Sequence, residues 1–270
     1  MDPLENEAKK TEESGDLESA LRLWKELATK RKDSVLFCDY GRVAEKLGLW
    51  DEAENAFATA LRMDQQFPPA LESMGSLWFT RTDKSDAESF QTAKEWFLKA
   101  LKYERNARLL TFLGATYAAA GDIHEARSAF EEAILIDPDY EEAFYNLAKI
   151  EKDTGERRAV DLLEKAIAID PDYSLAHQEL GRLYQHAGDL TSAEYHFRRS
   201  LDGDPTDYWS HLFLANLFAA QGKNLEAEKM YRFATSVHPE IRAGVEFFAR
   251  FLTSIGKQEE ASSVRAGLSR

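Results

Sequence analysis

The chain has 270 residues, of which 44% are hydrophobic, so it can bury a large apolar core. Its formal net charge of −14 argues against a nucleic acid or an anionic membrane as the principal partner, because both repel a net anion at long range. A single cysteine, Cys38, excludes an intrachain disulfide and is typical of a reducing compartment.

Neither a secretory signal nor a membrane span is predicted. The opening stretch MDPLENEAKK has no apolar run, and the most apolar stretch, Leu212 to Ala220, falls well short of the about 20 residues that a spanning helix needs. We therefore expect a soluble, cytoplasmic protein without direct membrane insertion.

An alanine recurs along the chain every 33 or 34 residues, apart from one interval of 40. Most of these alanines are followed by a large apolar residue four positions later and a small or aliphatic one three positions beyond, which is one stripe of a helix. A glycine stands five residues before most of them, and a second apolar stripe precedes that glycine. Each repeat therefore predicts two helices joined by a glycine turn. The alanines are Ala20, Ala53, Ala93, Ala126, Ala159, Ala193, Ala227 and Ala261.

In chain order, the repeats are predicted at 1–33, 34–67, 68–106, 107–140, 141–173, 174–207, 208–241 and 242–270. The first repeat opens with a polar helix, and the last has Arg265 where others have a core aromatic, so both ends are predicted to be caps. The third repeat lacks the glycine, with Thr82 nearby, and carries an insertion within Arg81 to Trp96. Its aromatic residues indicate either extra helical turns that form a binding ridge or lengthened helices that pack together.

This order of residues resembles the tetratricopeptide repeat, as in Leu113-Gly114, Tyr117, Ala126, Phe130 and Pro138 of the fourth repeat. The resemblance covers essentially the whole chain. It implies an all-α, right-handed superhelical solenoid of about eight helix-turn-helix hairpins, and we expect 1–270 to form a single elongated domain because each hairpin packs only on its neighbours.

No catalytic motif is present: we find no phosphate-binding loop, dinucleotide fingerprint, nucleophile elbow or H-E-x-x-H helix. The acidic stretch from Asp202 to Asp207 is not a calcium loop, because Phe213 stands where the bidentate glutamate would be. His177 and His211 fall on core-facing positions and are interpreted as satisfied core residues. We therefore expect no enzyme, no metal and no cofactor.

The resemblance implies that the first helices of successive hairpins line a concave groove. The ninth residues of the second to eighth repeats include Arg42, Lys149, Arg182 and Arg250, so four of seven are basic. We interpret this face as a groove for an extended or helical partner segment of acidic character. The alternative is a solvated helix face, on which Lys149 and Lys152 lie near acidic residues. The predicted groove residues are Arg108, Tyr145, Lys149, Arg182, His186, Trp209 and Asn216.

The function predicted from these features is a non-catalytic scaffold or adaptor that binds partner proteins and does not bind nucleic acid. The alternative is a structural element that self-associates by stacking end to end in a larger complex. Polar caps at both ends argue against stacking, whereas Phe247, Phe248 and Phe251 near the C-terminus favour it.

Overall fold

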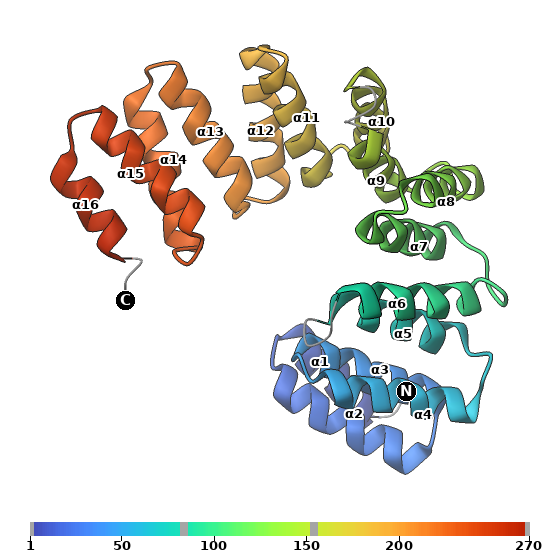
Figure 1. Ribbon diagram of the computed structural model, residues 1–270. Coiled ribbons are helices and arrows are strands. Elements are labelled where there is room, and N and C mark those ends of the chain that lie inside the picture. Colours follow the sequence, from blue (N-terminus) through green and yellow to red (C-terminus); the bar gives the residue numbers. More distant parts are fainter. Residues whose placement is uncertain (1–2, 82–85, 152–155, 268–270) are drawn as a thin grey trace. The chain divides into compact units, whose positions relative to one another are not determined.

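The computed structural model describes residues 3–81, 86–151 and 156–267 (Figure 1). Within these residues the secondary structure is helical throughout, without a strand. The helices are α1 (Pro3–Glu13), α2 (Leu17–Arg31), α3 (Ser34–Lys46), α4 (Trp50–Met63), α5 (Pro68–Thr80), α6 (Asp86–Ala100), α7 (Ala107–Ala120), α8 (Ile123–Ile136), α9 (Glu141–Glu151), α10 (Glu156–Ile169), α11 (Ser174–His186), α12 (Leu190–Gly203), α13 (Tyr208–Ala220), α14 (Asn224–Val237), α15 (Arg242–Ser254) and α16 (Gln258–Ala266).

The expectation of an all-α chain built from helix-turn-helix hairpins is confirmed. Each of the eight predicted ranges contains two of these helices. The turn between α7 and α8 shows why glycine is needed there, because Gly121 ends α7 with φ of 88°, which a residue with a side chain rarely adopts. The corresponding Gly155, like Thr82, lies outside the described residues.

In four of the hairpins the core forms where an aromatic ring of the second helix meets a glycine of the first. Phe130 on α8 is 1% exposed, and a Cβ atom added to Gly114 on α7 would lie only 2.6 Å from its ring. The glycine therefore gives the ring the space it occupies. The same pairing joins Gly41 with Phe57, Gly75 with Phe97, and Gly181 with Phe197.

The contacts divide the chain into two compact units, residues 1–150 and 151–270, which we call the N-terminal and C-terminal units. The boundary falls within the fifth predicted repeat, at the end of α9. The single elongated domain expected from the repeats therefore stays a prediction.

In the third hairpin, the residues described on either side of 82–85 show that the insertion lengthens helix α6. Helix α6 begins seven residues before Ala93, whereas α8 begins three residues before the equivalent Ala126, so α6 has an additional turn. Phe90 in that turn packs on Phe79 of α5 with ring centroids 5.9 Å apart. These contacts agree with the interpretation that the lengthened helices pack together.

Three side chains at the C-terminal end bear on the predicted cap. Phe248 and Phe251 are 2% and 6% exposed and pack against Tyr231, so they belong to the core. Arg265 on α16 instead stays exposed and forms an ion pair with Glu246 at 3.2 Å. The outer helix thus presents a charged residue where the other hairpins present a large apolar one.

Candidate functional site

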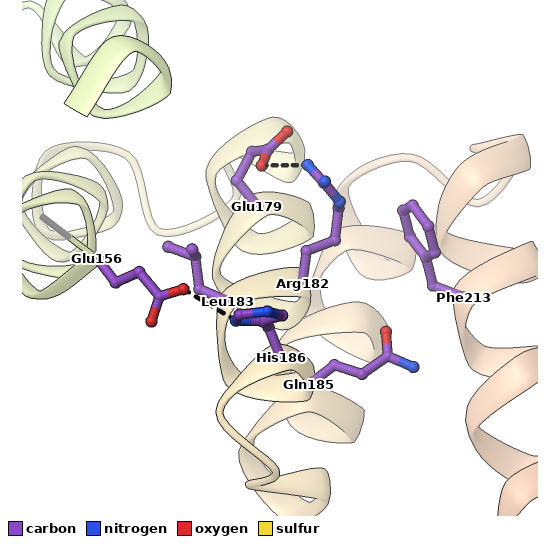
Figure 2. A pocket seen from close by; sticks show the side chains of 7 residues that line it. All are labelled: Glu156, Glu179, Arg182, Leu183, Gln185, His186 and Phe213. Carbon is purple, nitrogen blue, oxygen red and sulfur yellow. Dashed lines mark hydrogen bonds and ion pairs between the residues drawn. The ribbon is translucent and has the colours of Figure 1, made fainter. Parts of the chain in front are cut away.

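A cavity of about 600 Å³ lies on the first-helix face of the C-terminal unit (Figure 2). Helix α11 supplies most of its wall, Phe213 of α13 closes one side and Glu156, the first residue of α10, closes the other. Its lining residues are Glu156, Glu179, Arg182, Leu183, Gln185, His186 and Phe213.

Arg182 is the central cation of this cavity. Its guanidinium donates a hydrogen bond to Glu179 Oε2 at 2.7 Å and lies 5.8 Å from the centroid of the Phe213 ring. The side chain is 41% exposed, so its ion pair with Glu179 contributes little to stability. Because a guanidinium has five N–H donors, Arg182 can bind a second carboxylate without losing Glu179.

His186 and Glu156 form a second polar contact at the rim, 2.9 Å between Nδ1 and Oε1 (Figure 2). Both side chains are more than half exposed. The cavity therefore combines a cation, an imidazole ring and two carboxylates, of which Arg182, His186 and Glu156 are exposed to a polar ligand while Glu179 is largely buried.

An aromatic strip leads from the core to the surface beside Arg182. Phe197, which is fully buried, stacks on Phe213 with centroids 5.3 Å apart, and Phe213 stacks on Trp209 at 6.1 Å. Trp209 itself is 45% exposed. An apolar side chain of a partner can therefore pack on Trp209, which the Phe213 ring connects to the guanidinium of Arg182.

The N-terminus of α13 holds Trp209 in place. Asp207 caps this helix by accepting hydrogen bonds from the backbone N–H groups of Trp209 and Ser210, and Gln178 of α11 donates to its Oδ2 at 2.6 Å. Capping fixes the first turn of a helix, where Trp209 is the second residue. The exposed indole thus stands on an anchored backbone.

Asn216 lies one turn beyond Phe213 on α13 and does not line the cavity. Its Oδ1 accepts a hydrogen bond from the Tyr231 hydroxyl at 2.5 Å. The carbonyl of this amide is therefore used within the hairpin, and only its NH₂ group is left for a ligand.

The other three predicted groove residues belong to the N-terminal unit. Arg108 forms an ion pair with Glu72 and lines a cavity of about 510 Å³ on the first helices α3, α5 and α7. Tyr145 is only 9% exposed, and the ammonium group of Lys149 lies 5.3 Å from its ring centroid. Lys152, which follows Lys149 by three positions, lies outside the described residues.

The structure thus brings Arg182 and His186 into one cavity and places Trp209 beside it through Phe213. Neither Phe213 nor Glu179 was among the groove residues predicted from the sequence. A signal was available for Phe213, because it follows Trp209 by four residues on one helix face.

The histidines that were interpreted as core residues are buried. His177 and His211 are 2% and 8% exposed, and their Nε2 atoms contact the Pro171 and Pro205 carbonyl oxygens at 3.1 and 2.9 Å. The interpretation as satisfied residues holds for His177; the Nδ1 atom of His211 is buried without a hydrogen-bond partner. In the described part of the chain, no three residues of metal-ligating type are grouped as an ion would require.

Two family models match the sequence. The model described as "Cilia and flagella-associated protein 70 middle TPR-like domain" matches residues 4–134, and the model described as "Tetratricopeptide repeat" matches residues 162–195. The chain is a tetratricopeptide-repeat (TPR) protein. Comparison with curated proteins gives no match by sequence.

Solved structures of TPR proteins are similar to this chain. The APC/C hetero-tetramer Cut9–Hcn1 matches 91% of it with a TM-score of 0.73 at 16% identity, and the human IFIT1 dimer with m7Gppp-AAAA matches 97% with a TM-score of 0.67 at 18% identity. The chain covers 48% and 66% of those two chains. At such identities the similarity shows the fold, which commonly mediates protein–protein interaction and assembly without catalysis.

Among the described residues, we find no helix that combines the length and the apolar character needed to traverse a bilayer.

Proposed function

We propose that this TPR protein is a non-catalytic, cytoplasmic scaffold that binds a segment of a partner protein on its first-helix face. The observation that carries the proposal is the exposed Trp209 stacked on the half-buried Phe213, whose ring lies beside the exposed guanidinium of Arg182 in the cavity. Tryptophan and arginine are the side chains that most often dominate the energy of protein interfaces.

The chemistry of the site favours a segment that presents a carboxylate next to an apolar side chain. The carboxylate would bind Arg182 in a charge-assisted hydrogen bond, and His186 at the rim would add a second contact. The apolar side chain would cover Trp209 and so remove its exposed surface from water. An extended or helical segment of acidic character meets both requirements.

The remaining predicted groove residues have secondary roles in this proposal. Asn216 would offer its NH₂ group to a backbone carbonyl of the segment. Arg108, Tyr145 and Lys149 form a separate set in the N-terminal unit, where Arg108 and Lys149 present the exposed charge and Tyr145 lies beneath Lys149. We propose that they extend the contact with the same partner or bind another acidic segment.

The test compares two arginines that have similar surroundings on different faces. Arg198 on α12 forms an ion pair with Glu194 and lies 5.6 Å from the Phe218 ring centroid, much as Arg182 does with Glu179 and Phe213, but it stands on a second helix. The wild type, Arg182→Glu and Arg198→Glu are each used to capture proteins from a lysate of the native host, with mass spectrometry as the readout.

We expect a partner that the wild type and Arg198→Glu capture and that Arg182→Glu loses, with circular dichroism unchanged in all three. Equal capture by Arg182→Glu would contradict the assignment of this site. The corresponding Lys149→Glu variant then tells whether the N-terminal unit contributes to the same capture.

End-to-end assembly is a second candidate, because Phe247 on α15 is 41% exposed. Because Phe248 and Phe251 are buried, the C-terminal end exposes less apolar surface for such assembly than the sequence indicated. Light scattering over a range of concentrations decides the matter, since a monomer at every concentration would exclude assembly of this kind.

A further inference from the structure

Two grooves occupy equivalent places in successive hairpins of the N-terminal unit. One lies between α4 and α6 above α5, and the other lies between α6 and α8 above α7. Leu61 and Leu71 line the first, and their counterparts by repeat position, Leu101 and Leu110, line the second. The first groove has a volume of about 260 Å³, whereas the second has about 710 Å³.

The residue three positions after the repeat alanine differs between the two grooves. In α6 this residue is Trp96, whose indole lines the first groove and lies 3.9 Å by centroid from the Lys99 ammonium group. In α8 it is Ala129, which contributes only a methyl group to the second groove. The α6–α8 groove is therefore the equivalent inter-hairpin space without an aromatic side chain at this position of the second helix, although Tyr117 of α7 also lines it.

The lining of the α6–α8 groove combines an apolar set, Leu98, Leu101, Leu110, Leu113, Tyr117 and Ala129, with a polar set, Lys102, Arg105, His124, Glu125, Ser128 and Glu132. Leu110 and Leu113 of α7 lie near its floor and are 2% and 5% exposed, and Leu98 of α6 lines it while 41% exposed. An aromatic side chain that entered would remove the exposed part of Leu98 from water and would gain dispersion contacts with the floor.

The mouth of the groove carries a cation that is available to a ligand. Lys102 lines the groove, and within the described residues it makes no ion pair. Its neighbour Arg105 is engaged with Glu132 of α8. A carboxylate close to the entering aromatic side chain would therefore meet Lys102.

We propose that the α6–α8 groove binds an aromatic side chain of a partner protein in the position that Trp96 occupies in the preceding hairpin, with an acidic residue of the partner near Lys102. This surface is formed largely by second helices and is separate from the site at Arg182. Loss of either site leaves the other intact.

The probe for this proposal is indole-3-propionate, which joins the ring and the carboxylate in one small molecule. We expect a millimolar titration to shift the amide resonances of Leu98, Leu101 and Ala129 in a saturable way in the ¹⁵N spectrum. Ala129→Trp, which installs the residue of the preceding hairpin, should weaken this binding by at least about tenfold.

Two further variants test the contribution of the Lys102 charge to binding of the probe. Lys102→Glu should weaken binding a few-fold, whereas Lys99→Glu, which makes the same change at the filled groove, should leave it unchanged. If Ala129→Trp does not fold, Ala129→His replaces it, because α12 has His196 at this position.

The absence of saturable shifts in the wild type would overturn the proposal, and so would equal binding by Ala129→Trp. Analytical ultracentrifugation of the wild type and Ala129→Trp tests whether a second copy of this chain, instead of a partner protein, occupies the groove. Self-association that Ala129→Trp abolishes would identify a second copy of this chain in the groove and would overturn the assignment to a partner protein.

Discussion

The first-helix faces of the two units carry the same kind of charge pair in different surroundings. In the N-terminal unit Arg108 pairs with Glu72, and the second residue of α3 on this face is Val35. In the C-terminal unit Arg182 pairs with Glu179, and the second residue of α13 is Trp209, stacked on Phe213. Each arginine also lies beside a phenylalanine ring, Phe112 at 5.6 Å from Arg108 and Phe213 at 5.8 Å from Arg182. Exposed ion pairs contribute little by themselves, so the exposed Trp209 is what distinguishes the C-terminal face.

Truncation of a core aromatic residue should destabilise the two units equally. Equal losses would show that the units differ only at their surfaces. Phe130 in α8 and Phe197 in α12 are both buried against a glycine of the preceding helix. Replacing either by alanine should lower the free energy of unfolding by about 3–5 kcal/mol. Both effects can be measured by urea denaturation, with the unfolding of α8 and α12 monitored by hydrogen exchange. A loss of unfolding free energy below about 1 kcal/mol for one variant would show that the cores differ.

Truncation of Trp209 sharpens the comparison at the surface. Trp209→Ala should weaken binding of the partner captured by the wild type by about 2 kcal/mol or more, because an exposed indole next to an arginine is typical of an interface hot spot. Val35→Ala makes the equivalent truncation in the N-terminal unit and should change binding less than about twofold. Calorimetric titration gives both values, and similar losses would remove the distinction between the two faces.

Lowering the pH should also affect the stability of the two units in opposite directions. His177 accepts through Nδ1 from His196 Nδ1–H at 3.0 Å, since its own Nε2–H donates to Pro171. Burial lowers the pKa of both histidines, and together with the neighbouring His177 it brings the pKa of His196 to about 4. In the N-terminal unit, burial instead raises the pKa of Asp39 and Glu45.

The direction of each change in stability follows from whether the folded or the unfolded chain binds more protons. Below about pH 6.5 the unfolded chain protonates His196 before the folded chain does, so the stability of α11 and α12 falls as the pH drops toward 4. The raised carboxyl pKa values act in the opposite direction in α3. From pH 7 to pH 5 we expect α11 and α12 to lose about 2 kcal/mol by hydrogen exchange relative to α3 and α4. His196→Leu should remove most of this loss, and a loss that persists in that variant would refute the cause given.

The smallest expected effect concerns the arginines themselves. Arg108→Gln and Arg182→Gln should each change the free energy of unfolding by less than about 0.5 kcal/mol, because both ion pairs lie at the surface, with the arginine side chains 61% and 41% exposed. Thermal unfolding tests this, and a larger cost at either position would assign that arginine a structural role.

The repeat pattern predicted the helices, and two of the residues that it assigned to the groove, Arg182 and His186, line the candidate cavity. The spacing of Gly121 and Ala126 placed the turn between α7 and α8, and the core-facing positions of His177 and His211 were correct. Glu179 was not foreseen as the partner of Arg182, although it lies three residues away on the same helix. Which acid a surface arginine binds depends on rotamers and on the neighbouring helix, and neither has a period in the sequence.

The sequence by itself determined the hairpins and their order. Helix period, alanine-to-aromatic spacing and glycine turns act over a few residues, so they can be recognised without knowledge of distant contacts. The tertiary structure alone decided which surfaces are open. The space beside Ala129 depends on side chains from three helices, and the strip from Phe197 to Trp209 depends on how α12 packs on α13. Such spaces are set by the packing of residues far apart in the chain. At the same repeat position, Trp96 lines the smaller groove and Ala129 lines the larger one.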